Sequence, residues 1–345
     1  MNGIESYFRK LDGLGASELL LSSDRPPLYR AANELLPLPG EGTVADSDLR
    51  AELQALLTSH DWAKLQSEQQ LSFVLALGPE RRVRGQCGLS MRGLTARLCL
   101  LRHQESLEDL QLPASLARFA EADSGLCVVT GPAGSGKSSL VASLLGLVAK
   151  LRNAHIVSIE DAVEYLQRSP SVSQRALGRD YGHCLAAIET ALDTDADVIA
   201  CAQLETEGVF ELLVEAANSG VLVIAEMPGH GTVNALEQLV STSALAQRAQ
   251  LCSDLAECLL GAVSLDLLPR KGGGRIPALE ILLASPNVAS LVRDGKISML
   301  ASLLDREHGM QSMDRSLLDL ATRGLVEGRE AHARAIDKRA FQAWA

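Results

Sequence analysis

The sequence predicts an α/β protein in which a small α+β domain precedes a larger domain built on a parallel sheet. Its 345 residues are enough for two domains. From residue 114 onward, short apolar runs alternate with helical stretches, which is typical of a parallel sheet covered on both faces. A polar segment that closes on Pro113 precedes them. We therefore expect an N-terminal domain, a linker, a sheet domain and a C-terminal helical region at residues 1–102, 103–113, 114–285 and 286–345.

The N-terminal domain is expected to combine strands with helices. Its expected elements are an apolar segment, one helical stretch and two strands, at residues 12–22, 46–67, 71–77 and 94–101. An arginine-rich segment with Arg82, Arg84 and Arg92 lies between the two strands. On residue pattern alone, such a segment is a charged turn exposed to solvent.

Four buried strands are expected in the larger domain, at residues 126–130, 155–160, 198–202 and 221–226. Each is a short, continuous apolar run, and helical patterns separate them. Past Ser285 the pattern is helical to the end, with breaks at Gly295, Gly309 and Gly324.

The composition argues against several classes of protein. The net charge is −11, and a nucleic-acid partner needs clustered Lys and Arg, so we expect none. No segment reaches the roughly 18 apolar residues that a membrane span needs, and the start lacks the apolar region of a signal peptide. Seven scattered cysteines without a CxxC pair predict buried, reduced thiols in a cytoplasmic protein.

A phosphate-binding loop is predicted at residues 131–138, where GPAGSGKS follows an apolar strand and opens a helix. The glycines let the backbone approach phosphates closely, and the helix presents its positive end to an anion. Lys137 is expected to reach the β- and γ-phosphates of ATP, and the Ser138 hydroxyl to complete the shell of a Mg²⁺ ion. The alternative is a glycine-rich turn that no longer binds nucleotide. The predicted binding residues of this loop are Gly131, Gly134, Ser135, Gly136, Lys137, Ser138 and Ser139.

The rest of the chain resembles the PilT-type retraction ATPases of type IV pili, which belong to the wider secretion ATPase superfamily. The likeness covers nearly the whole chain. The GGGR and GMQ matches lie outside any general phosphate-loop signature and make the resemblance specific. The matching segments are ASELLL at 16–21, RPPLYR at 25–30, the arginines at 82, 84 and 92, SIEDAVEY at 158–165, KGGGR at 271–275 and GMQSMD at 309–314.

This resemblance implies a PAS-like N-terminal domain, a RecA-like ATPase domain and a ring of six subunits. ATP would then sit between subunits, with Arg82, Arg84 and Arg92 reaching the phosphates from an N-terminal domain. The ring would be a homo- or hetero-hexamer of PilT-like subunits, docked on the inner-membrane platform protein of a pilus machine. We expect it to be cytoplasmic and peripheral to that membrane, without a span of its own.

The chain departs from the family pattern at the positions that act on the attacking water. The catalytic glutamate of the family is Gln203 here, and the arginine after it is Glu205. The family histidine is Pro228, with His230 two residues later. A neutral amide cannot accept a proton, although some GTPases orient water with glutamine. Two other acids are candidates to replace the lost base: Glu226 at a strand end, and Glu160 in the segment SIEDAVEY at 158–165, here called the acidic box. His230 is a weaker substitute sensor.

Two functions from different classes follow. The first is a working ATPase that drives pilus retraction in twitching motility or a related secretion machine. The second is a ring subunit that binds ATP but hydrolyses it poorly, and so regulates or scaffolds an active motor. A phosphate-loop kinase for a small metabolite is a distant third, because it leaves the GGGR and GMQ matches unexplained.

Overall fold

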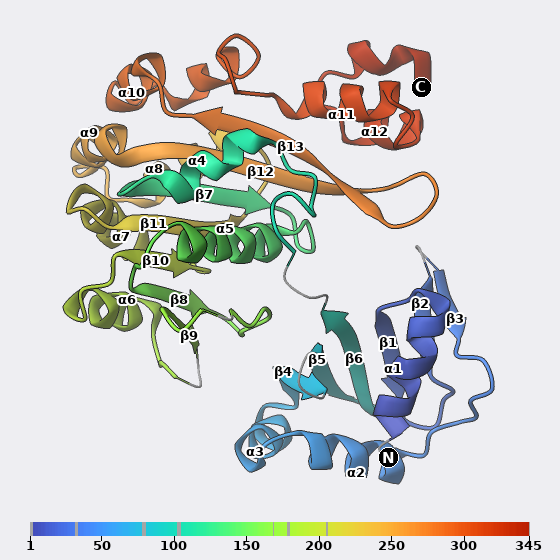
Figure 1. Cartoon of the computed structure of the whole chain (residues 1–345). Coiled ribbons are helices and arrows are strands. Elements are labelled where there is room, and N and C mark those ends of the chain that lie inside the picture. The colour runs from blue at the N-terminus through green and yellow to red at the C-terminus, as the bar shows by residue number, and fades with distance from the viewer. Residues whose placement is uncertain are drawn as a thin grey trace. The chain divides into compact units, whose positions relative to one another are not determined.

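The computed structural model describes residues 3–31, 34–77, 81–101, 105–167, 169–177, 180–204 and 206–344. The chain divides into two compact units, Met1–His103 and Gln104–Ala345. Figure 1 shows a separate sheet in each unit. Of the residues predicted as a linker, 103 and 104 lie outside the described ones, and Leu107 is buried in the core of the second unit.

The N-terminal unit is an antiparallel sheet of six strands in the order β3-β2-β1-β6-β5-β4. The strands are β1 (Glu18–Ser22), β2 (Leu28–Ala31), β3 (Glu34–Pro37), β4 (Gln70–Leu77), β5 (Arg81–Ser90) and β6 (Gly93–Leu101). The helices are α1 (Gly3–Leu14), α2 (Asp46–Leu56) and α3 (Ser59–Glu68). The single helical stretch expected at 46–67 is therefore two helices, because Thr58 caps a new one by accepting the N–H of Asp61.

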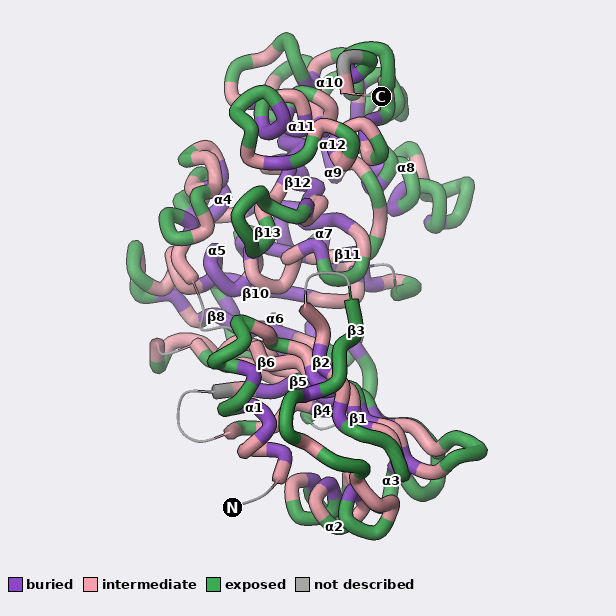
Figure 2. Tube along the Cα trace, turned by 90° about the vertical axis from the view of Figure 1, so that its right-hand side faces the viewer, coloured by how far each residue is buried: buried purple, intermediate pink, exposed green. Residues whose placement is uncertain are grey.

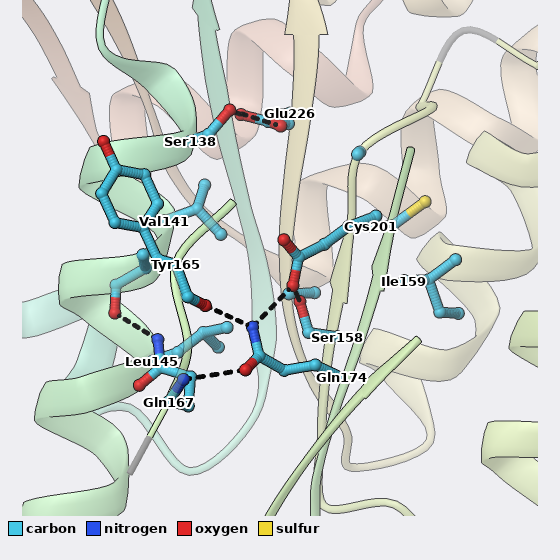
Figure 3. A pocket seen from close by; sticks show the side chains of 14 residues that line it. Ser138, Val141, Leu145, Ser158, Ile159, Tyr165, Gln167, Gln174, Cys201 and Glu226 are labelled. Carbon is cyan, nitrogen blue, oxygen red and sulfur yellow. Dashed lines mark hydrogen bonds between the residues drawn. The ribbon is translucent and has the colours of Figure 1, made fainter. Parts of the chain in front are cut away.

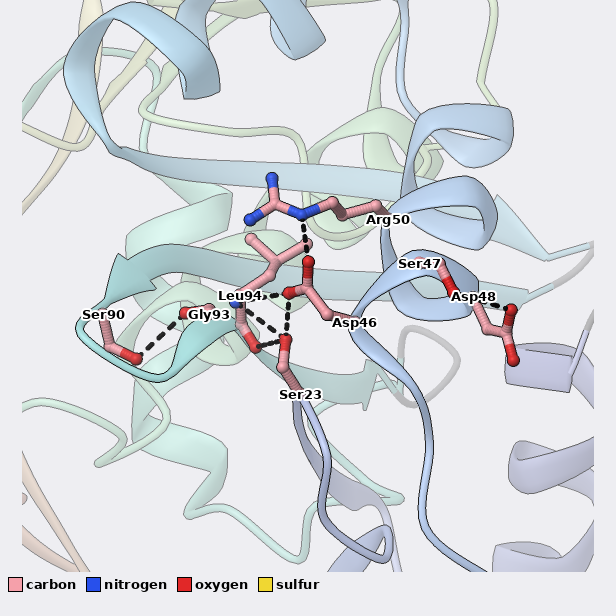
Figure 4. A network of polar contacts seen from close by, with 8 residues as sticks. All are labelled: Ser23, Asp46, Ser47, Asp48, Arg50, Ser90, Gly93 and Leu94. Atoms are coloured by element: carbon pink, nitrogen blue, oxygen red, sulfur yellow. Dashed lines mark hydrogen bonds and ion pairs between the residues drawn. The ribbon is translucent and has the colours of Figure 1, made fainter.

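A polar network ties α2 to the sheet of this unit (Figure 4). The Ser23 hydroxyl donates to Asp46 and accepts the N–H of Leu94 on β6 at 2.8 Å. Asp46 also accepts from Arg50, one turn along α2. The hydrogen bond from Ser23, helped by Arg50 and the Leu94 N–H, lowers the pKa of Asp46 to about 2. Its stabilising contribution is thus complete at neutral pH and is lost only as the pH falls from about 4 towards 2.

The arginine-rich segment is a strand, so the expected charged turn is wrong for Arg82 and Arg84. Both lie on β5, on the same side of the strand because they are two residues apart. Between them, Val83 is buried in the core of the unit. Arg92 does lie in the turn that joins β5 to β6, and it is exposed.

The C-terminal unit contains a seven-stranded sheet in the order β13-β12-β7-β11-β10-β8-β9. All neighbours are parallel except β12 and β13. The strands are β7 (Gly125–Gly131), β8 (Ile156–Glu160), β9 (Val172–Ala176), β10 (Val198–Cys201), β11 (Leu222–Pro228), β12 (Leu259–Pro269) and β13 (Arg275–Leu283). The four predicted strands are confirmed within two residues at each end, whereas β9, β12 and β13 were not predicted.

Helices connect and cover this sheet. They are α4 (Ala117–Glu121), α5 (Lys137–Leu151), α6 (Cys184–Asp193), α7 (Val209–Asn218), α8 (Thr232–Thr242), α9 (Arg248–Cys258), α10 (Pro286–Arg293), α11 (Met313–Thr322) and α12 (Gly328–Arg334), with short 3₁₀ turns at 114–116, 297–302 and 338–344. The connection from β7 to β8 through α5 crosses the sheet in one direction. The connections through α6 and α7 run the opposite way, so right-handed crossovers place α5 on the face opposite α6 and α7. None of the helices in the described ranges combines the length and apolar character needed to span a bilayer.

The core of this unit follows its central strands. All residues of β7 and β10 are buried, as are the first four of β11. Figure 2 shows β10 in purple, the colour of buried residues. A separate apolar cluster joins α11 and α12 to β12 and β13. Because β7, β11, β10 and β8 are parallel neighbours, their carboxyl ends meet at one edge, where ligands bind in open α/β sheets.

One buried carboxylate links that edge to the C-terminal helices. Glu280 on β13 is 4% exposed. Its Oε1 accepts the backbone N–H of Thr232 at 2.6 Å and the Thr232 hydroxyl at 2.7 Å, at the start of α8. Its Oε2 accepts the N–H of Met313, the first residue of α11, at 3.4 Å. A negative charge at two helix N-termini is stabilising.

Candidate functional site

The phosphate loop connects β7 to α5 with backbone torsions that require glycine. Gly131 has φ +154, and a Cβ there would lie 2.4 Å from Ser135 Oγ and 2.5 Å from the carbonyl oxygen of Leu265. Gly136 has φ +98 and immediately precedes the first residue of α5. The loop therefore closes tightly over the end of β7 and leads directly into a helix N-terminus, which suits an anion.

Lys137 folds back onto this loop, and two buried hydroxyls lie in the loop or just before it. Lys137 Nζ donates to the carbonyl oxygens of Gly131 at 2.8 Å and Pro132 at 3.0 Å. Ser135 Oγ and Thr130 Oγ1 are buried and have no hydrogen-bond partner in the part of the chain that the structure describes. A buried hydroxyl without a partner costs about 1–3 kcal/mol. The loop thus holds an ammonium and the unsatisfied hydroxyl of Ser135, which fits a phosphate group.

Ser138 and Glu226 meet beside the loop (Figure 3). Glu226 lies on β11, opposite Val129 of β7 in the strand register. The Ser138 hydroxyl donates to Glu226 Oε1 at 3.2 Å, and Oε2 lies at 3.4 Å. Burial raises the pKa of Glu226 to about 7, against the opposing effects of the Lys137 charge and the Ser138 hydrogen bond. Of the three predicted catalytic residues, Glu226 is the one that contacts the phosphate loop.

Glu160 ends β8 and lines a small pocket that Ser138 and Glu226 also line. Its Oε1 accepts from Ser158 Oγ at 2.8 Å and from Gln174 Nε2 at 3.0 Å. Burial raises the pKa of Glu160, although these two hydrogen bonds act in the opposite direction. The pocket between Glu160, Glu226 and α5 has a volume of about 20 Å³, enough for about one water molecule.

The acidic box is fastened to α5 and β9. Tyr165 OH lies 2.7 Å from Ser139 Oγ, and the Tyr165 carbonyl oxygen accepts from Gln174 Nε2 at 2.7 Å. Gln174 was missed from the sequence because it lies on β9, a strand that no apolar run marks. Ser139 therefore contacts the acidic box in this structure.

Gln203 follows β10 and points to the acidic box. Its Nε2 donates to Asp161 Oδ1 at 2.6 Å. Glu205 lies outside the described residues. On β11, Pro228 is in register with Gly131, at the histidine position of the resemblance. His230 is exposed, and its carbonyl oxygen accepts from Asn234 at 3.1 Å.

The three candidate arginines lie in the N-terminal unit, whereas the phosphate loop lies in the C-terminal unit. Arg82 is half-buried, and Arg84 and Arg92 are exposed. Their predicted contact with phosphates across a subunit boundary stays a prediction.

Comparison with known proteins decides the family. The family model described as "Type II/IV secretion system protein" matches residues 75–269, more than half of the chain. The chain belongs to this family. Its members that resemble the chain include a twitching motility protein of Neisseria gonorrhoeae, 34% identical over 235 residues, which are 67% of this chain and 63% of that protein. The chain thus spans less than two thirds of the gonococcal protein.

One further relative and one solved structure match over almost their whole length. The type IV pilus retraction ATPase PilT of Pseudomonas aeruginosa is 27% identical over 328 residues, 93% of this chain and 94% of that protein. A crystal structure of the pilus retraction motor PilT with bound ADP has a TM-score of 0.87 at 27% identity and covers 98% of both chains. The resemblance to the PilT-type family and the predicted α/β fold class, with an N-terminal domain before a P-loop ATPase domain, are therefore confirmed.

Proposed function

We propose that this chain binds ATP with Mg²⁺ and is a subunit of a type IV pilus retraction machine or a related secretion machine. The observation that carries the proposal is the phosphate loop, where Lys137 donates to loop carbonyl oxygens and the buried Ser135 hydroxyl has no partner among the described residues. Ser138 would hold the Mg²⁺ ion, whose charge would neutralise the phosphates. The names of the relatives, a twitching motility protein and a retraction ATPase, support the pilus machine.

Mg-ATP is expected to stabilise the chain, and Lys137→Ala to remove that effect. A ligand that binds only the folded state raises its stability by RT ln(1 + [L]/Kd), about 2.7 kcal/mol at a hundredfold excess over Kd. Thermal melting with and without Mg-ATP measures it. The matched control is Lys150→Ala at the exposed end of the same helix, which should keep the shift. Equal shifts in all three proteins, or none, would contradict binding at this loop.

We also propose that the subunits form a ring, either of identical copies or with a more active relative, docked on a platform protein at the inner membrane. Arginines of one N-terminal domain would then act on nucleotide bound by the next subunit. An arginine acting in trans is worth about 10³-fold or more in phosphoryl transfer, which a monomer cannot use. Light scattering should show a larger assembly when Mg-ATP or a partner subunit is added. A strict monomer under every condition would contradict the ring.

A second candidate function is a subunit that binds ATP, hydrolyses it poorly and regulates an active motor. The hydrogen bond from Gln203 to Asp161 favours it, because that amide holds the position of the family's catalytic glutamate.

A further inference from the structure

Glu226 lies on β11, the strand next to β7 and the phosphate loop. The carboxylate of the family pattern falls at the Gln203 position, after β10, which is one strand further from the loop. In the sheet order, β11 lies between β7, which leads into the loop, and β10, which leads to Gln203. Parallel register with β7 brings the end of β11 beside the first turn of α5. An acid at this point of the sequence therefore reaches Ser138, whereas a side chain after β10 reaches Asp161.

The direction of the Ser138 hydrogen bond matters for metal binding. A hydroxyl has one hydrogen to donate and two lone pairs. A metal ion takes a lone pair, so a hydroxyl that ligates a metal must send its hydrogen to another acceptor. Among the described residues, the Ser138 hydroxyl donates its hydrogen to the carboxylate of Glu226. The contact leaves the lone pairs of Ser138 available.

The charges around Glu226 also fit a divalent cation. The carboxylate is half-buried, where charges act more strongly than in water. Lys137 offsets part of its charge, whereas Glu160 and Glu164 add to the negative potential. Oxygen ligands from a hydroxyl, a carboxylate and phosphates are those that Mg²⁺ prefers.

The end of β10 offers no such group in the segment that the structure describes. Ala202, Gln203 and Leu204 follow the strand, and the Gln203 amide is bonded to Asp161. In phosphate-loop NTPases a carboxylate usually helps the loop hydroxyl to hold Mg²⁺. We propose that in this chain Glu226 on β11 does so: it orients the Ser138 hydroxyl and supplies the negative charge that holds the cation of the nucleotide complex. Glu226 is thus a positioning residue for the metal, and the inference rests on the proposed nucleotide binding.

The test measures Mg²⁺ affinity separately from nucleotide affinity. Calorimetry gives the Kd of ADP in the presence of EDTA, and then the Kd of Mg²⁺ for the full-length protein saturated with ADP. Glu226→Gln removes the charge and keeps the shape, and Glu226→Ala removes the acceptor as well. Loss of a group that orients a metal ligand typically weakens metal affinity about 10- to 100-fold. We expect that loss in Mg²⁺ affinity for both variants, with the Mg²⁺-free Kd of ADP within about threefold of the parent.

Glu189→Gln is the matched control, because it removes one negative charge from an exposed position on α6 that does not belong to the phosphate loop or the acidic box. It should change Mg²⁺ affinity by less than about threefold. The inference is overturned if the Glu226 variants bind Mg²⁺ as the parent does, or if Glu189→Gln weakens Mg²⁺ binding equally. Absence of ADP binding by the parent overturns the proposed function as well, so the two failures are distinguishable.

Discussion

The unmodified chain is expected to hydrolyse ATP about 10²- to 10⁴-fold more slowly than its Gln203→Glu variant, the range that one general base typically contributes. The groups that bind phosphate lie in the loop and are present. The Gln203 amide cannot accept a proton, and it is bonded to Asp161. Binding without contacts that act in the transition state gives affinity but not rate. In the variant, repulsion from Asp161 would turn the new carboxylate away from the acidic box. In that orientation the carboxylate could reach a water molecule.

Steady-state phosphate release measures this difference. The matched control is Gln250→Glu on α9, where the glutamine also donates to an aspartate, Asp254, at 2.7 Å. It should stay at the parent's rate, because it is remote in sequence and lies on an exposed helix face. Fast turnover by the unmodified chain that Lys137→Ala abolishes would contradict the prediction. Glu160 and Glu226 would then be the acids to test as the base.

Replacement of Glu280 by alanine is expected to cost about 3–5 kcal/mol of folding stability. The change leaves three donors at the starts of α8 and α11 without their acceptor, and hydrogen bonds to a charged group contribute about 1.5–3 kcal/mol each. The bond to Met313 is long at 3.4 Å, so it adds least to this sum. Glu280→Gln keeps one acceptor oxygen and should cost less, about 1–3 kcal/mol.

Urea denaturation in a Trp62→Phe background measures this effect, because Trp344 then reports the C-terminal unit alone. Glu257→Ala on α9 is the control, since this glutamate is exposed and its loss should change stability by at most about 0.5 kcal/mol. If the midpoints of Glu280→Ala and Glu257→Ala coincide, Glu280 does not hold the two helices in place.

The buried parallel strands could be predicted because each is a continuous apolar run. Strand β5 could not. Its inward positions include Gly85, where a Cβ would lie 2.1 Å from the ring of Phe73, so the apolar alternation is interrupted to make room for a neighbour. Arginines on the outward face then made the segment resemble a turn. Strand β12 and the edge strand β13 were missed too, although both are largely buried.

The phosphate loop could be predicted in full because the motif and its flanking strand and helix are local in sequence. The contact of Ser138 with Glu226 joins residues 88 positions apart and depends on β11 lying beside β7. The sequence marked Glu226 only as a strand-end acid. Likewise, the bond of Gln203 to Asp161 depends on β10 lying in parallel register beside β8.

The central claim is that the loop at 131–138 holds a nucleotide. The most direct test incubates the purified chain with Mg-ATP, separates the protein from free nucleotide and identifies what stays bound by chromatography. We expect about one nucleotide per chain, recovered mainly as ATP, and none above background with Lys137→Ala. Retention by the parent no greater than by Lys137→Ala would contradict it.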